Sequence, residues 1–157
     1  MALSAVAHKL QLQKYLAELE RLLGREVLPD ELGSLEQAKM LREVSKNLVY
    51  QPLTDFEIAF DEKKTTRFQL FVERLCQSNS SPVYLFTPRT IFFGALKIDG
   101  LQSVKFDFDF ALNEEGALAF LVSDLSDSLL LDFFVSPSGV QRLRMETQGA
   151  NWGSTKF

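Results

Sequence analysis

Over residues 104–112, apolar and polar side chains alternate at every position. The even-numbered positions are apolar and include three Phe residues, whereas the odd-numbered positions are charged or small. A repeat of two residues is typical of a β-strand with one buried face and one solvated face. The pattern therefore predicts a strand that buries its Phe rings and turns Asp107 and Asp109 toward solvent.

Three earlier segments have the spacing of three and four residues that is typical of amphipathic helices. They cover residues 4–23, 34–46 and 66–77. Gly24 follows the first segment at the position of a left-handed C-terminal cap. Ser34-Leu-Glu-Gln37 has the form of a capping box and opens the second helix. A short alternating stretch at residues 55–60 predicts a strand between the second and third helices.

From Val83 onward the sequence predicts strands joined by short turns. They are expected near residues 83–86, 90–98, 104–112, 118–122, 129–135 and 141–148. Asp99-Gly100 is the strongest signal for a two-residue hairpin turn, because both turn positions require a positive φ. Glu114-Glu115-Gly116 and Pro137-Ser138-Gly139 each fit a three-residue loop with Gly in the left-handed position. The Gly139 loop sets Leu131 opposite Met145, Phe133 opposite Leu143 and Asp132 opposite Arg144.

These elements predict the α+β class, with the N-terminal helices and one inserted helix packed on one face of an antiparallel β-meander of about five to six strands. The length of 157 residues suits a single domain over residues 1–157. Its expected parts are a helical part (1–50), a sheet that contains the helix 66–77 (54–148) and a tail (149–157).

Charge is unevenly distributed along the chain. The net charge is −4, and residues 99–132 contain eight acidic residues and one basic residue. A negative surface disfavours nucleic acid and favours a basic partner. The apolar runs are far shorter than the ~20 residues of a membrane span, and the N-terminal stretch lacks the basic region of a signal peptide. Cys76 is the single cysteine, so we expect a cytoplasmic protein without an internal disulfide.

Residue types that carry catalysis or bind metals are scarce. His8 is the single histidine, which leaves no histidine–cysteine zinc cluster, and neither phosphate-binding glycine motif is present. Asp107 and Asp109 lie about 7 Å apart on a strand, a separation that glycosidases also use. They point away from the core, however, and a raised pKa needs a pocket. We therefore expect no enzyme activity, no cofactor and no metal.

One alternative follows from the order of elements. Helices followed by a curved, Phe-lined sheet resemble the cone-like architecture of nuclear-transport-factor-2-like proteins. The resemblance implies a small apolar-ligand binding protein or an enzyme with its site inside the cone. Lys97 and Gln141 are the polar candidates at the margin of that face, and a packed Phe core is the favoured use of it.

A second resemblance concerns the class of protein. Residues 83–94 (VYLFTPRTIFFG) and the Trp152-Gly153 ending belong to a small, acidic α+β chain that resembles the immunity proteins bacteria make against their own secreted or contact-delivered toxins. The resemblance implies a non-catalytic inhibitor that binds a basic toxin domain, often a nuclease, and blocks access of the substrate. In this interpretation charges steer the encounter and an aromatic residue anchors the complex. The expected partner-binding residues are Asp107, Asp109, Asp124, Asp127, Asp132 and Phe134.

Overall fold

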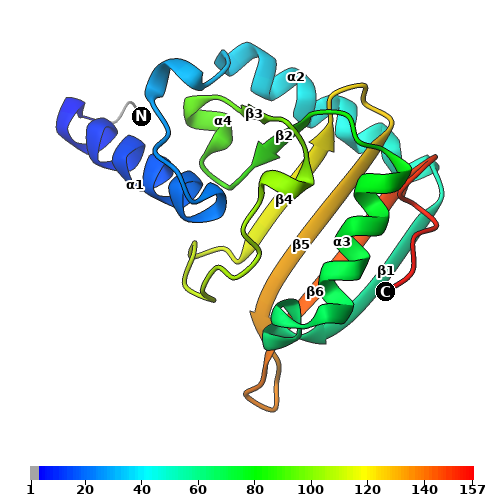
Figure 1. The fold of residues 1–157 in the computed structure, drawn as a ribbon. Coiled ribbons are helices and arrows are strands. Elements are labelled where there is room, and N and C mark those ends of the chain that lie inside the picture. Colours follow the sequence, from blue (N-terminus) through cyan, green and yellow to red (C-terminus); the bar gives the residue numbers. More distant parts are fainter. Residues whose placement is uncertain (1–3) are drawn as a thin grey trace.

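The fold is a six-stranded antiparallel sheet with four α-helices around it (Figure 1). The computed structural model describes residues 4–157, apart from the side chains of residues 49 and 50. The strands are β1 (Leu53–Ala59), β2 (Val83–Phe86), β3 (Leu96–Ile98), β4 (Ala117–Val122), β5 (Asp127–Val135) and β6 (Gln141–Gly149), in the spatial order β1-β6-β5-β4-β2-β3. The helices are α1 (Ala5–Leu23), α2 (Leu35–Lys46), α3 (Thr66–Ser78) and α4 (Thr90–Phe93). The predicted α+β class is confirmed.

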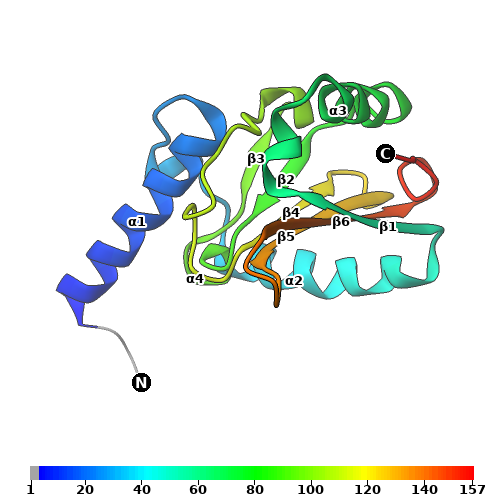
Figure 2. The same cartoon turned by 90° about the horizontal axis from the view of Figure 1, so that it is seen from below.

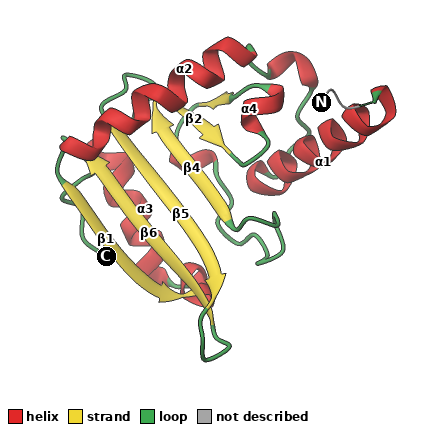
Figure 3. Cartoon of the chain, turned by 180° about the vertical axis from the view of Figure 1, so that it is seen from behind, coloured by secondary structure: helices red, strands yellow, loops and turns green. Residues whose placement is uncertain are grey.

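The helices cover both faces of the sheet, and not one face as the sequence pattern suggested (Figures 2 and 3). On the inner face, Phe68 and Phe71 of α3 belong to the main hydrophobic core. On the outer face, Leu41 of α2 packs with Leu121 in a second, smaller cluster. The reason lies in β4, where Phe120 and Leu121 are adjacent and both buried. A strand that is apolar on both sides needs cover on both faces.

The predicted helix ends are confirmed. The hydroxyl of Ser4 accepts a hydrogen bond from the N–H of Ala7 at the start of α1, and that of Ser34 accepts one from Gln37 at the start of α2. Such caps satisfy N–H groups that have no partner within the helix. Gly24 has a φ of 67° and ends α1 in the left-handed conformation, as expected.

The prediction of a strand at residues 104–112 is wrong. This stretch, which we call the Phe–Asp segment, runs as turns and irregular backbone between β3 and β4. Its alternation nevertheless survives as a pattern of burial, because Phe108 is 4% exposed and packs in the main core while Asp107 and Asp109 are exposed. The segment lies on the inner face, where the Phe106 and Phe68 ring centroids are 5.4 Å apart.

The expected partner strand of this segment does not form either. Residues 90–93 make the short helix α4, and the hydroxyl of its first residue, Thr90, accepts a hydrogen bond from the N–H of Thr87. Gly94, with a φ of 103°, ends it. Gly100 has a φ of 165°, which is extended backbone and not the conformation of a tight hairpin turn. β4 therefore pairs with β2, and the Phe–Asp segment remains outside the sheet.

The β5–β6 hairpin has the predicted register. Leu131 lies opposite Met145, Phe133 opposite Leu143 and Asp132 opposite Arg144. Gly139 takes a φ of 84° in the loop that joins the two strands. The alternation of apolar residues in β5 and in β6 requires the same register as the loop with Gly139 in the left-handed region. Together they determine the pairing.

Candidate functional site

Two of the six predicted partner-binding residues lie side by side on the surface. Asp107 and Asp109 project from the Phe–Asp segment, and Asp61 is exposed on the 3-10 turn that follows β1. All three carboxylates act on the same lysine, Lys63, whose pKa their charges raise. They therefore lie near one position on the molecule.

Lys63 itself points inward, although its neighbours in sequence are polar. The residue is 3% exposed. Its Nζ donates a hydrogen bond to the carbonyl oxygen of Phe106 at 2.7 Å and lies 4.6 and 4.5 Å from the ring centroids of Phe60 and Phe108. Burial lowers the pKa of Lys63 to about 8, and the nearby carboxylates oppose the shift. The charged end of the Lys63 side chain therefore lies inside the protein and not on its surface.

The sheet end next to these carboxylates also exposes apolar side chains. Phe134, Val135 and Val140 flank the β5–β6 loop and are 36, 56 and 47% exposed. The adjacent Phe133 contacts the Phe–Asp segment, with its ring centroid 5.6 Å from that of Phe108. We call this region the acidic edge: Asp61, Asp107 and Asp109 together with Val135 and Val140. The side chain of Phe134 lies on the opposite face of β5, with that of Asp132.

The other three predicted residues lie elsewhere. Asp124 is exposed in the turn between β4 and β5, at the opposite end of the sheet from the β5–β6 loop. Asp132 lies on the outer face opposite Arg144, and burial raises its pKa. Asp127 is wholly buried and does not reach the surface, so a steering role for it is wrong.

Asp127 instead joins the tail to the sheet. Its Oδ1 accepts hydrogen bonds from the N–H groups of Asn151 and Trp152, both at 2.8 Å, and its Oδ2 accepts from the amide nitrogens of Asn79 and Asn151, both at 2.9 Å. Trp152 is in turn 1% exposed and donates its indole N–H to the carbonyl of Leu75. The tail therefore packs against α3 and the sheet and does not offer Trp152 to a partner.

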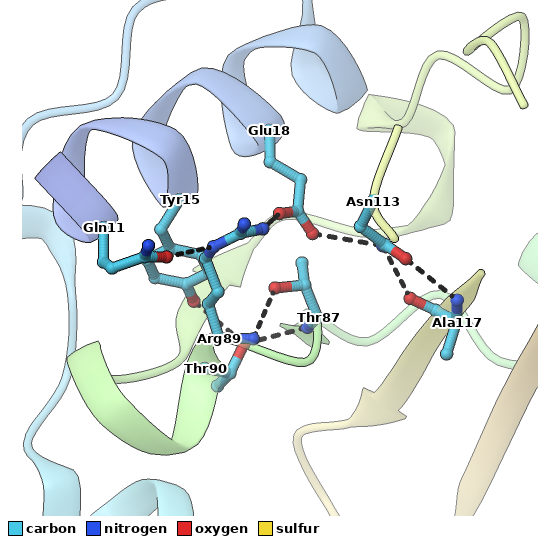
Figure 4. Close-up of polar contacts among 8 residues, drawn as sticks. All are labelled: Gln11, Tyr15, Glu18, Thr87, Arg89, Thr90, Asn113 and Ala117. Carbon is cyan, nitrogen blue, oxygen red and sulfur yellow. Dashed lines mark hydrogen bonds and ion pairs between the residues drawn. The ribbon is translucent and has the colours of Figure 1, made fainter. Parts of the chain in front are cut away.

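A buried polar cluster connects α1 to the rest of the molecule (Figure 4). Glu18 is 2% exposed, and its carboxylate accepts hydrogen bonds from Arg89 at 2.9 Å and from Asn113 at 3.2 Å. The hydroxyl of Tyr15 donates to the carbonyl of Gly94 at 2.6 Å and lies 2.9 Å from the hydroxyl of Thr90. The partners of Glu18 are 71 and 95 residues away, which explains why the sequence pattern did not reveal the cluster.

The cluster has the shifted pKa values that active sites often show, but it is fully paired. Burial raises the pKa of Glu18, which the hydrogen bonds from Asn113 and Arg89 only partly oppose, and burial also raises that of Tyr15. Each buried side-chain oxygen and nitrogen of the cluster has a hydrogen-bond partner. Ion-pair networks that hold elements together perturb pKa values in the same way, so we interpret this one as a clamp on α1.

Grooves lie on both sides of the sheet, and the inner one, of ≈ 570 Å³, runs between α3 and the Phe–Asp segment without reaching the strands. On the inner face, α3, the Phe–Asp segment and the tail pack against the strands, so the Phe-rich face is solid core and not a cone. Lys97 and Gln141, the polar candidates for a cone, are exposed. On the outer face, a groove of ≈ 530 Å³ runs between α2 and strands β4 and β5.

Within residues 4–157, no group of three or more His, Cys, Asp and Glu side chains is arranged to hold a metal ion. Over the same residues, no helix is both long enough and apolar enough to cross a membrane. A comparison with family models, curated proteins and solved structures gives no match for this chain.

Proposed function

We propose that the protein is a non-catalytic binding module that captures a basic protein partner through the acidic edge. Following the class resemblance of its sequence, we propose that it acts as an immunity protein in the cytoplasm and neutralises a toxin domain. The observation that carries the proposal is that exposed Asp107 and Asp109 lie near an exposed apolar hairpin end, while the neighbouring Lys63 is buried.

The charge of the edge supports a basic partner. Because the Nζ of Lys63 is enclosed and bonded to a backbone carbonyl, it does not form a surface ion pair with the surrounding carboxylates. Glu114 and Glu115 are also exposed in the loop that leads into β4, and Lys64 and Lys105 are the exposed bases nearest in sequence. A surface with an excess of one sign accelerates the encounter with an oppositely charged protein.

The apolar part of the edge supports a long-lived complex. Interfaces are held mainly by a few large side chains that lose their water. Val135 is exposed at this hairpin end, and Phe134 is an exposed large side chain on the opposite face of the same strand end. The Phe–Asp segment is anchored by inward-facing rings, with Phe106 5.9 Å from Phe120 between centroids. A segment that is already ordered loses little conformational entropy when a partner binds.

The test is affinity capture from the source cells followed by association kinetics. The double variant Asp107→Lys/Asp109→Lys reverses the charge of the edge. The matched control, Asp30→Lys/Asp99→Lys, changes the net charge equally at two other exposed positions. A partner captured by the wild type and by the control should associate at least tenfold more slowly with the edge variant, with a weaker dependence on salt.

Equal association rates for the edge variant and the control would reject the acidic edge as the docking surface. The immunity role has a separate test, the survival of cells that produce the captured partner. Co-expression of the wild type or the control should protect them, and the edge variant should not. If the captured partner is harmless to cells, the protein-binding proposal stands and the immunity role is rejected.

A further inference from the structure

The outer-face groove forms because the strands carry small side chains on this face. Ala117 and Ala119 of β4 and Ser128 of β5 lie along its floor, whereas the inner face of the same strands carries Phe and Leu. Leu41 of α2 and Leu130 of β5 border the space. Protein interiors are normally filled to crystal-like density. An apolar space of ≈ 530 Å³ has the size of a site for a small molecule.

One polar atom in the wall of the groove lacks a partner. Gln148 is 9% exposed, and its Nε2 donates a hydrogen bond to the Oε2 of Glu146 at 3.0 Å. This bond fixes the orientation of the amide, because the opposite orientation would place two oxygens in contact. The Oε1 of Gln148 is buried and has no hydrogen-bond partner among the side chains and backbone that the structure describes. A buried acceptor without a donor costs about 1–3 kcal/mol, and few remain in native proteins.

The charge of the lining narrows the class of ligand. Arg42 of α2 is the single charged residue among the described residues that line the groove, and no carboxylate lines it. Ser45 and Ser128 supply hydroxyl groups, and the remaining surface is mostly apolar. Because the Glu146 carboxylate lies beside Gln148 and Arg42 lies on α2, the lining as a whole suits a neutral molecule with an apolar body.

We propose that this groove binds a small apolar molecule that carries a hydroxyl or N–H donor. The apolar body lies against Ala119, Leu121 and Leu130, and the donor binds the Oε1 of Gln148 while its Nε2 keeps the bond to Glu146. The site lies between α2 and the outer face, whereas the Phe–Asp segment of the acidic edge lies on the inner face (Figure 2). It is therefore a second site, and it does not depend on the protein-binding proposal.

The experiment compares two probes that differ in one donor. 1-Naphthol has a hydroxyl donor, and 1-methoxynaphthalene has the same rings and oxygen but no donor. Titration calorimetry should show saturable binding of 1-naphthol to the wild type, about fivefold to tenfold tighter than that of the ether, since a hydrogen bond contributes about 1 kcal/mol. In Gln148→Leu this preference should disappear, and in Gln141→Leu, exposed on the same strand, it should persist.

Two further variants make the outcome decisive. Ala119→Phe fills the groove from its floor and should abolish binding of both probes, whereas Asp107→Lys/Asp109→Lys should leave it unchanged. Circular dichroism checks that each variant is folded. Absence of saturable binding to the wild type, equal affinity of the two probes for it, or unchanged binding to Ala119→Phe would each overturn the proposal. Native mass spectrometry of the purified protein then shows which molecule the groove retains.

Discussion

Asp127 offers the sharpest test of the structure, because the sequence pattern placed it on the surface and the fold places it inside. We consider the change Asp127→Asn, which keeps the shape and removes the charge. Its Oδ1 can still accept from the N–H groups of Asn151 and Trp152. At the position of Oδ2, however, a new NH₂ group faces the amide donors of Asn79 and Asn151 and the hydroxyl of Ser126.

The magnitude follows from these contacts. The Ser126 hydroxyl can rotate and accept, so two charge-assisted hydrogen bonds are lost and their donors face a donor. Hydrogen bonds to a charged group contribute about 1.5–3 kcal/mol each, so we expect the free energy of unfolding to fall by about 3–5 kcal/mol. For a domain of this length, that corresponds to a decrease in Tm of about 10–15 °C.

The pH dependence gives an independent check. Burial raises the pKa of Asp127, but hydrogen bonds from Asn79, Asn151 and Trp152 outweigh it and hold the pKa below its ordinary value. A carboxyl group whose pKa is lower in the folded state stabilises the protein at pH values above about 4, and the contribution is lost as the pH falls through the folded pKa. Asp127→Asn should therefore lose part of the acid sensitivity of the wild type.

Urea unfolding followed by the fluorescence of Trp152, the only tryptophan, measures the effect. The matched control is Asp99→Asn, at an exposed aspartate away from the Ser126–Asp127 contacts, which should cost less than about 1 kcal/mol. The urea dependence of the unfolding free energy should be unchanged in both variants. A loss below 1 kcal/mol for Asp127→Asn would refute the interpretation of this residue as an internal anchor.

Three other changes test the rest of the fold by urea unfolding. Gly116→Ala places a methyl group against the backbone of β5 and should cost about 3 kcal/mol or more, whereas Gly139→Ala, which has a similar positive φ but open space around it, should cost about 1 kcal/mol. Between pH 8 and 10 the unfolding free energy should rise by roughly 1–3 kcal/mol, because the unfolded chain then binds the proton that folded Lys63 has lost; a flat profile, or the same rise in Lys63→Met, would contradict this. Glu18→Ala leaves a guanidinium without its buried counter-charge and should cost about 3 kcal/mol, and Glu18→Gln should cost less.

The elements that the sequence predicted well are those whose signals are local. Ser34 and Gly24 mark helix ends through hydrogen bonds and backbone angles that involve only a few neighbouring residues. The β5–β6 hairpin combines two alternating segments with a loop whose Gly139 takes the required positive φ. In both cases short-range chemistry and burial favour the same geometry.

The Phe–Asp segment shows what an alternating pattern does not determine. A hydrophobic pattern that repeats every two residues predicts that alternate side chains are buried, and Phe108 and Asp107 follow that rule. The pattern does not predict whether the backbone pairs with a neighbouring strand. Residues 90–93 form a helical turn instead, with Gly94 at its end; the Thr-Pro start and glycine end of this turn are a signal for a short helix that the strand interpretation overlooked.

Of the candidate site, the sequence predicted only those features that follow from the local alternation of apolar and polar residues. Asp107 and Asp109 point outward because their Phe neighbours point inward. This prediction is therefore correct although the segment does not form a strand. The enclosure of Lys63 and the burial of Asp127 depend on residues more than 20 positions away, which no local pattern reports. The outer-face groove depends on what α2 leaves uncovered, and this is a property of packing and not of sequence period.

The order of strands has a consequence for how the chain is made. β6 is the last of these six strands to leave the ribosome, yet it lies between β1 and β5 and is the one described strand that pairs with β1. Until synthesis reaches residue 149, Leu53–Ala59 has both of its edges open. Nascent chains with unpaired strand edges are prone to aggregate and are substrates of chaperones. This sheet therefore closes only after translation of β6, and chains that stop before that strand present β1 to the quality-control machinery.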